Sequence, residues 1–288
     1  MSANPSILLV EPDYFDVSYR INPWMQPELW ARDPAAFRDA AKQAFDRLCA
    51  ALHGVGCELI VAPDVPGLPD MVFPANAAVV LDGKALMARF RHVQRQGEEA
   101  PLRELFLGLQ RSGHIDEIAT LPAGCYQEGA GDCIWDATRQ CFWAAYGPRS
   151  SRQAIGLIES HFGQEVIALE LATERSYHLD VCFSPLSGGE VLYYPPALTP
   201  ASLEHLRRRV PAESLIEATA DDLAHFSVNA VNVGDALVLA RSTAALRGQL
   251  SRRGYRLHEL DLQPFMLSGG GAFCMTLRLD RTSTPRGP

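Results

Sequence analysis

The sequence lacks the features that mark several classes of protein. No apolar run approaches the roughly 20 residues that a helix needs to cross a bilayer. Residues 1–12 contain no basic start followed by a long apolar stretch, so no secretory signal is predicted. Lys and Arg number 26 against 34 Asp and Glu and are scattered, which disfavours a nucleic-acid partner. We therefore expect a cytoplasmic protein that acts on a small molecule, with no membrane partner.

Cysteine pairs are also missing. The seven cysteines are odd in number and form no C-x-x-C pair, so neither a disulfide framework nor a zinc site of the usual spacing is predicted. In a reducing compartment most such thiols are small buried hydrophobic side chains. At most one or two of them should therefore carry chemistry.

Apolar and polar segments alternate in an order that repeats. A strand at 6–10, a helix at 34–53, a strand at 57–61 and a hairpin over 77–88 are predicted from the spacing of apolar residues and from turn residues. The same order returns about every 50 to 60 residues, with strands expected at 115–121, 133–135, 141–145, 165–169, 177–184, 191–194, 227–231, 236–239, 257–262 and 274–279, and helices at 151–162, 201–209 and 243–252. An α/β sheet protein without internal symmetry is the alternative.

No linker divides the chain. Its 288 residues, 47% of them apolar, contain no low-complexity stretch or block of like charge. We expect one domain over 1–280, followed by a polar tail at 281–288 that is rich in Pro and Gly and is expected to be disordered.

Cys274 stands three residues after a run of three glycines. Glycines let the backbone approach a ligand closely, and a cysteine placed just behind them can serve as a nucleophile. A glycine turn before a buried strand cysteine is the alternative, and for this motif alone it is favoured.

Two further motifs carry acids and a histidine. His178 and Asp180 are two residues apart in a predicted strand, so both are expected on one face, where a general acid/base can lie beside a carboxylate that binds a cation. Glu128 and Asp132 frame the sequence Glu-Gly-Ala-Gly-Asp. A structural histidine and a tight turn are the alternatives to these functional interpretations.

Taken together, the motifs resemble one family. The ordered set is Asp70-Met-Val-Phe-Pro-Ala-Asn76, Glu128-Gly-Ala-Gly-Asp132, His178-Leu-Asp180 and Gly269-Gly-Gly-Ala-Phe-Cys274. It is similar to the guanidine-modifying enzymes of the pentein superfamily, and its motifs look most like those of arginine dihydrolases. The resemblance spans nearly the whole chain. It implies a five-bladed α/β propeller with pseudo-fivefold repeats and a site at its axis.

The resemblance also implies roles for individual residues. Cys274 would attack the guanidinium carbon, His178 would act as general acid and then base, and Glu128 would hold the imidazolium. Asp180 would pair with the guanidinium and favours an unmethylated substrate, since dimethylarginine hydrolases generally lack an acid at this position. These side chains supply the whole chemistry, so no metal and no organic cofactor is implied.

The other expected substrate contacts come from polar residues and glycines near the motifs. Asn76 stands where deiminases usually carry a second carboxylate, and with Asn22 it resembles the dihydrolases. Either Arg89 or Arg91 is a candidate clamp for the substrate carboxylate, with exposed strand-edge arginines as the alternative. The remaining expected contacts are Asp70, Asp132, Asn229, Gly270 and Gly271.

The resulting hypothesis is a hydrolase of free L-arginine. It would form ornithine, ammonia and carbon dioxide, or stop at citrulline, through a covalent amidino-thioether. The alternatives are a dimethylarginine dimethylaminohydrolase, an amidinotransferase and a pentein that only binds a ligand. A homo-oligomer is possible for any of them.

Overall fold

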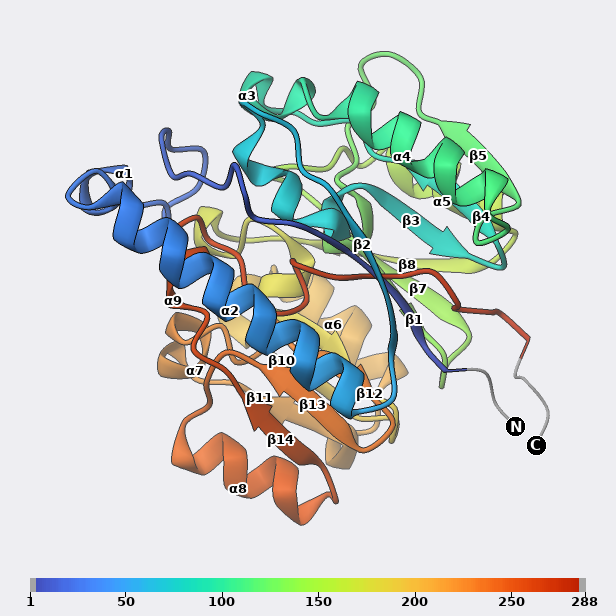
Figure 1. Ribbon diagram of the computed structural model, residues 1–288. Coiled ribbons are helices and arrows are strands. Elements are labelled where there is room, and N and C mark those ends of the chain that lie inside the picture. The colour runs from blue at the N-terminus through green and yellow to red at the C-terminus, as the bar shows by residue number, and fades with distance from the viewer. Residues whose placement is uncertain (1–3, 285–288) are drawn as a thin grey trace.

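Five small sheets arranged about a common axis make up the fold (Figure 1). This computed structural model describes residues 4–284. Each sheet has three strands, and the sheets are, in hydrogen-bonded order, β15 (Leu277–Arg278), β1 (Ser6–Val10) and β2 (Glu58–Ala62); β3 (Ala78–Leu81), β4 (Lys84–Met87) and β5 (Glu117–Thr120); β6 (Cys133–Asp136), β7 (Cys141–Tyr146) and β8 (Glu165–Glu170); β9 (Phe183–Pro185), β10 (Val191–Tyr193) and β11 (Leu215–Glu217); β12 (Val231–Val233), β13 (Ala236–Leu239) and β14 (Arg256–Glu259). The predicted five-bladed α/β propeller is confirmed.

Every sheet combines an antiparallel pair with a parallel pair. In the order given, the first strand of each sheet is the inner strand, the second the middle strand and the third the outer strand. The inner and middle strands pair antiparallel, and the middle and outer strands pair parallel. A parallel pair needs a crossover connection, and in each sheet a helix supplies it. The longest helix of each crossover is α2 (Pro34–Gly54), α4 (Glu99–Arg111), α5 (Ala154–Phe162), α6 (Pro200–Arg209) or α8 (Ala244–Arg252). The shorter helices are α1 (Pro27–Trp30), α3 (Val93–Gln96), α7 (Ala220–Ala224) and α9 (Gln263–Met266).

Burial explains why the repeat is visible in the sequence. The middle strands lie between two neighbours and are almost entirely buried, so they are continuous apolar runs. The outer strands are partly exposed and carry charged ends. In the β3–β4 hairpin, Asp82 and Gly83 both have positive φ, at 53° and 71°, as expected for the predicted two-residue turn.

The longest helix, α2, shows how the crossovers are held. Asp33 caps its start by accepting a hydrogen bond from the amide of Ala36 at 3.1 Å, and Pro34 occupies the first turn. The face toward the sheets buries Phe45, Leu48 and alanines of the helix. Burial of each large apolar side chain contributes roughly 1.5–3 kcal/mol.

The last inner strand closes the ring. β15 pairs with β1, with Leu277 opposite Leu8, and Asp280 accepts a hydrogen bond from the amide of Ser6 at 3.1 Å. Of the predicted tail, residues 285–288 lie outside the described residues. Arg281 and Ser283 donate hydrogen bonds to the Trp135 carbonyl and to Asp82. The domain boundary at 280 stays a prediction.

Several predicted strands begin too early. Residues 177–182 are not strand but include the 3₁₀ turn Leu179–Val181, and β9 begins only at Phe183. Likewise β12 begins at Val231 and β15 at Leu277. These stretches are apolar because they are buried at the axis, and burial alone does not distinguish a strand from a buried turn. Helix α4 and strand β11 were not predicted.

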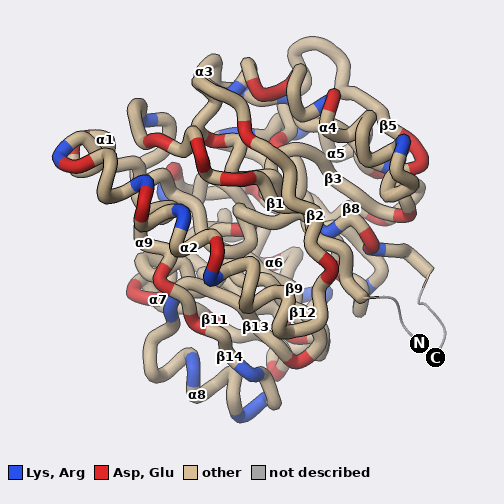
Figure 2. Tube along the Cα trace, viewed as in Figure 1, with Lys and Arg blue, Asp and Glu red and all other residues tan. Residues whose placement is uncertain are grey.

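Charges of both signs are mixed along the chain (Figure 2). Among residues 4–284, no helix is long and apolar enough to cross a membrane. The cytoplasmic location stays a prediction.

Candidate active site

The candidate site lies where the chain enters the inner strands. Three 3₁₀ turns, Pro74–Asn76, Gly129–Gly131 and Leu179–Val181, come just before β3, β6 and β9. Asn229 and Cys274 precede β12 and β15 in the same way. Because the five inner strands surround the axis, the polar side chains of these entry segments converge at one end of it.

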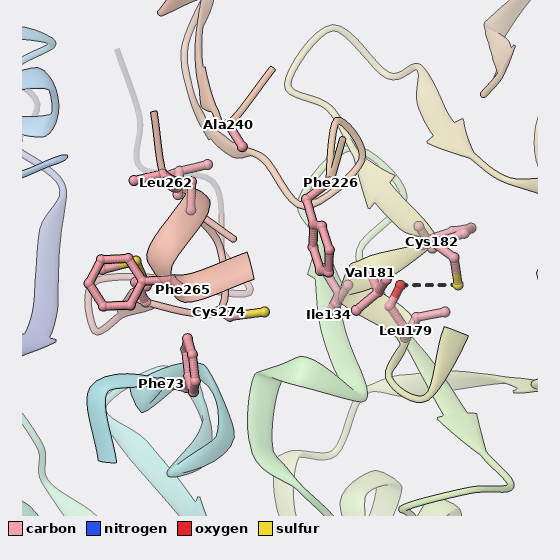
Figure 3. Close-up of a cluster of buried hydrophobic side chains, with 14 of the residues drawn as sticks. Phe73, Ile134, Leu179, Val181, Cys182, Phe226, Ala240, Leu262, Phe265 and Cys274 are labelled. Atoms are coloured by element: carbon pink, nitrogen blue, oxygen red, sulfur yellow. Dashed lines mark hydrogen bonds between the residues drawn. The ribbon is translucent and has the colours of Figure 1, made fainter. Parts of the chain in front are cut away.

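Cys274 is buried against two polar side chains. Its Sγ lies 3.2 Å from Oδ2 of Asp180 and accepts a hydrogen bond from Nδ2 of Asn229 at 3.1 Å. The amide of Cys274 donates to Oδ1 of the same asparagine at 3.2 Å. Phe73 and Phe265 lie beside this segment in the close-up (Figure 3). Burial and the neighbouring Asp180 raise the pKa of the thiol well above its usual value, so the free enzyme holds a thiol rather than a thiolate.

Asp180 has one free oxygen. Burial raises the pKa of this carboxyl to about 7, although the hydrogen bond from Cys274 opposes the rise. Oδ1 is buried and finds no hydrogen-bond partner among the described residues. A buried acceptor left in this way is costly unless a ligand supplies the donor.

Glu128 links the histidine to an arginine. Its Oε2 lies 2.8 Å from Nε2 of His178 and 2.8 Å from a guanidinium nitrogen of Arg149, and all three side chains are buried. Oε1 accepts the amide of Arg91 at 3.1 Å. Burial opposes ionisation, but Arg149 and His178 outweigh it and hold the pKa of Glu128 well below its usual range. Glu128 is therefore a fixed negative charge that orients the imidazole.

Asp132 holds the turn that follows His178 and lies near the imidazole. Its Oδ2 accepts from the Ser150 hydroxyl at 2.6 Å and its Oδ1 from the amide of Leu179 at 3.0 Å. Oδ2 is 4.0 Å from Nε2 of His178. Burial raises the pKa of Asp132 to about 6. This aspartate fixes the turn that carries His178.

The orientation of the Asn76 amide is set by Arg95. An arginine can only donate, so Oδ1 of Asn76 faces it at 2.8 Å. Nδ2 then points to the carbonyl of Glu128 at 3.1 Å and to Nδ1 of His178 at 3.5 Å. Arg95 is itself held by two hydrogen bonds of 2.8 and 2.9 Å to the buried Glu98.

A narrow cavity reaches Cys274 from this side. Its volume is only about 10 Å³, roughly the space of one water molecule. The cavity is lined by Ile21, Asn22, Asp70, Phe73, Asn76, Arg95, Arg149, Tyr177, Ser268 and Cys274.

Asp70 and Asn22, both predicted as substrate contacts, line the cavity and also bond to neighbouring segments of the chain. Asp70 accepts from the hydroxyls of Tyr19 at 2.7 Å and Ser268 at 3.0 Å. Asn22 accepts the amide of Trp24 at 2.9 Å and donates to the Ser268 carbonyl at 3.0 Å. Both therefore tie the N-terminal loop to the glycine segment that precedes Cys274.

The predicted carboxylate clamp does not lie in the cavity. Arg89 donates to the Leu121 carbonyl, and Arg91 donates to the carbonyl of Arg149 and lies over Tyr126. The cavity instead presents Arg95 and Arg149. Sequence reasoning missed both, because each is buried by an ion pair whose partner is recognised only once the chain is folded.

The glycines serve close packing. A Cβ added at Gly270 would come within 2.2 Å of the Phe73 ring, and one at Gly271 within 2.8 Å of Oδ1 of Asn229. A Cβ at Gly131 would meet Nδ2 of Asn76 at 2.3 Å. Gly270 and Gly271, predicted as substrate contacts, thus leave room for the side chains that surround Cys274.

Comparisons with known proteins identify the family of this chain. Residues 11–281 match the family model described as N,N dimethylarginine dimethylhydrolase, eukaryotic. A bifunctional arginine dihydrolase/ornithine cyclodeaminase of Synechocystis is 36% identical over 99% of this chain, which spans only 39% of that protein. An N(G),N(G)-dimethylarginine dimethylaminohydrolase of Mycobacterium tuberculosis is 30% identical over 94% of this chain and 84% of its own length.

A solved structure extends the likeness to three dimensions. The N-terminal domain of the cyanobacterial arginine dihydrolase ArgZ, a mutant with substrate bound, has a TM-score of 0.90 and 34% sequence identity, covering 98% of this chain and all of that one. Sequence and fold therefore agree on the family. The chain belongs to the dimethylarginine dimethylaminohydrolase family, within the guanidine-modifying pentein superfamily.

Proposed function

We propose that the protein hydrolyses the guanidino group of free L-arginine to ornithine, two ammonia and carbon dioxide, with Cys274 as nucleophile. The observation that carries the proposal is the unpartnered Oδ1 of Asp180, on a carboxyl whose other oxygen lies 3.2 Å from Sγ of Cys274. A planar guanidinium can donate two parallel hydrogen bonds to a carboxylate. Bound there, its carbon would lie next to the sulfur.

The first half of the reaction forms and hydrolyses a thioether. The bound cation lowers the pKa of the Cys274 thiol, and the thiolate then attacks the guanidinium carbon. His178, held by Glu128, donates a proton to the departing nitrogen, and ammonia leaves an amidino-thioether. The imidazole next takes a proton from water, which attacks the same carbon, and the sulfur is expelled to give citrulline.

The second half repeats these steps on the ureido group. Attack by Cys274 expels a second ammonia and leaves a thiocarbamate, and water then releases the sulfur and a carbamate that loses carbon dioxide. Arginine and two water molecules thus give ornithine, two ammonia and carbon dioxide. Asn76 supports this step because its neutral amide can remain beside a neutral ureido group, which a second carboxylate would disfavour.

Dimethylarginine is the second candidate substrate. The family model and the M. tuberculosis relative favour it. Asp180 argues against it, because methyl groups on the guanidinium would remove donors that the free Oδ1 needs. The similarity to arginine dihydrolases also supports arginine.

The test is to follow citrulline, ornithine and ammonia together after L-arginine is added to the purified protein. Two ammonia and one ornithine per arginine are expected, and none of the three products with Cys274→Ala. Citrulline as the end product would make the protein a deiminase. Turnover of dimethylarginine but not arginine would overturn the proposal, and a requirement for an acceptor amine would make the protein an amidinotransferase. No turnover with any of these substrates would favour a binding protein.

Arginine binding is expected to weaken as the pH falls through about 7. Asp180, whose pKa burial raises to about 7, is then protonated in the free protein and loses its attraction for the cation. If the bound cation keeps Asp180 ionised, Kd should rise roughly 30-fold between pH 8 and pH 5.5. Calorimetry with Cys274→Ser measures this without turnover. Neutral citrulline is the matched ligand and should show no such dependence, and an equally flat profile for arginine would remove Asp180 as its partner.

Agmatine, which lacks only the carboxylate of arginine, is expected to be a poor substrate. Arg95 and Arg149 line the cavity and would face that carboxylate. Loss of a buried charge pair costs about 2–5 kcal/mol, so kcat/KM should fall at least about 30-fold. Steady-state ammonia release from both substrates measures the ratio. Equal kcat/KM values would show that neither arginine binds the carboxylate.

A further inference from the structure

A second group of cavities lies at the opposite end of the axis from Cys274. The substrate cavity is reached where the inner strands begin, whereas these cavities are lined mainly by residues within or after the same strands. The outer cavity, of about 470 Å³, has the size of a site for a small molecule. An inner, mostly apolar cavity shares with it the four residues Trp135, Asn232, Arg278 and Arg281.

Arg281 is the cation at this end that has no direct ion pair among the described residues. Arg278 pairs with Asp280 at 2.7 Å, and Asp136 pairs with Arg139 at 2.8 Å. Arg281 donates one hydrogen bond, to the Trp135 carbonyl at 3.0 Å, and forms no ion pair with a described residue. Burial and the charge of Arg278 lower its pKa to about 10, although Asp280 and Asp136 oppose the change, so it stays a cation at neutral pH.

Trp135 adds a second free donor. The side chain is 3% exposed and lines both cavities. Its Nε1 is buried and has no hydrogen-bond partner among residues 4–284. A buried indole N–H normally finds an acceptor. An unmatched donor and an unmatched cation in adjoining cavities both point to an anionic acceptor.

The inner cavity also reaches the segment that carries the nucleophile. Phe273, directly before Cys274, and Thr276 line it, and so does Ala130 of the loop between Glu128 and Asp132. The Phe273 amide donates to the carbonyl of Asn229, whose side chain holds Sγ of Cys274. A ligand in this cavity would therefore contact residues adjoining both parts of the site.

We propose that this end of the axis binds a small monocarboxylate with a short apolar group, and that its binding alters the reactivity of Cys274. The carboxylate would accept from Arg281 and from Nε1 of Trp135, and the apolar group would extend toward Val79, Ile134 and Leu277, which line the inner cavity. Asp136 and Asp280 at the mouth disfavour an anion of higher charge.

Butanoate is the probe, with 1-butanol and inorganic phosphate as controls for the apolar group and for charge. In nitrogen-15 spectra, butanoate should shift the indole resonance of Trp135, assigned with Trp135→Phe. Affinity should be in the millimolar range, as is usual for so few atoms. Arg281→Met should weaken it at least ten-fold, and both controls should bind more weakly. A shift confined to the indole of Trp24, which lies two residues after Asn22 of the substrate cavity, would overturn the proposed site. An affinity that is unchanged in Arg281→Met would overturn it as well.

Iodoacetamide tests the coupling to Cys274. Saturating butanoate should change the rate of Cys274 alkylation at least two-fold in the unmodified protein and leave it unchanged in Arg281→Met. The same change in both proteins would mean that butanoate acts in the substrate cavity. Binding that altered no rate would support the site and overturn its effect on Cys274. Neither experiment depends on whether arginine is the substrate.

Discussion

Glu128→Gln is expected to lower kcat for arginine by about 10³-fold while changing KM little. Glu128 is the negative charge beside Nε2 of His178, and a neutral amide there no longer stabilises the imidazolium that must form as water is deprotonated. Both oxygens of Glu128 are already bonded to protein groups, so binding should be largely preserved. Steady-state kinetics separates the two constants. A loss confined to KM would mean that Glu128 binds substrate.

Loss of fold is the competing explanation for an inactive Glu128 variant. The substitution leaves Arg149 buried without its counter-charge, and breaking a buried pair costs about 3–5 kcal/mol. Glu98→Gln is the matched control, because it breaks a comparable buried pair with Arg95, which reaches the imidazole only through Asn76. Both variants should lose stability in urea unfolding, but Glu98→Gln should keep kcat for ammonia release within about ten-fold. An equal loss of kcat in both would make the effect structural.

The scaffold could be predicted from the sequence because its signals are local. Apolar runs marked the middle strands, and capping and spacing marked α2, whose end differs from the prediction by one residue. Of the three 3₁₀ turns that carry the site, the one at Leu179–Val181 was predicted as strand, because residues 177–182 are as apolar as a strand. His178 and Asp180 therefore do not lie side by side on a strand face, since Asp180 belongs to a 3₁₀ turn that begins directly after His178.

The contacts of the site depend on long-range pairing that no local pattern contains. Cys274 meets Asp180 and Asn229 across 94 and 45 residues of chain. The motifs indicated the nucleophile and its acid/base, but they did not reveal that Arg95 orients the amide of Asn76. An isolated arginine is usually exposed, and only the fold shows that Glu98 allows this one to be buried.

Asn76→Asp is expected to change the main product from ornithine to citrulline. The new carboxylate would accept from Arg95 as the amide does, but its second oxygen would face the carbonyl of Glu128, where Nδ2 now donates at 3.1 Å. It would also add negative charge to the substrate cavity, which favours the guanidinium over the neutral ureido group. Citrulline should then leave before a second attack. Chromatography of the products should show the ornithine to citrulline ratio falling at least ten-fold.

Asn22→Asp is the matched control for added charge. Asn22 lines the same cavity, but its amide bonds the Ser268 carbonyl and the amides of Trp24 and Met25 rather than the histidine turn. If position 76 itself determines whether the ureido group is attacked, Asn22→Asp should be slower but should still give ornithine. Supplying citrulline directly isolates the second half of the reaction, which should persist in Asn22→Asp and fail in Asn76→Asp. Ornithine as the main product of Asn76→Asp would show that the amide is not required, and a shift to citrulline in both variants would attribute the change to cavity charge alone.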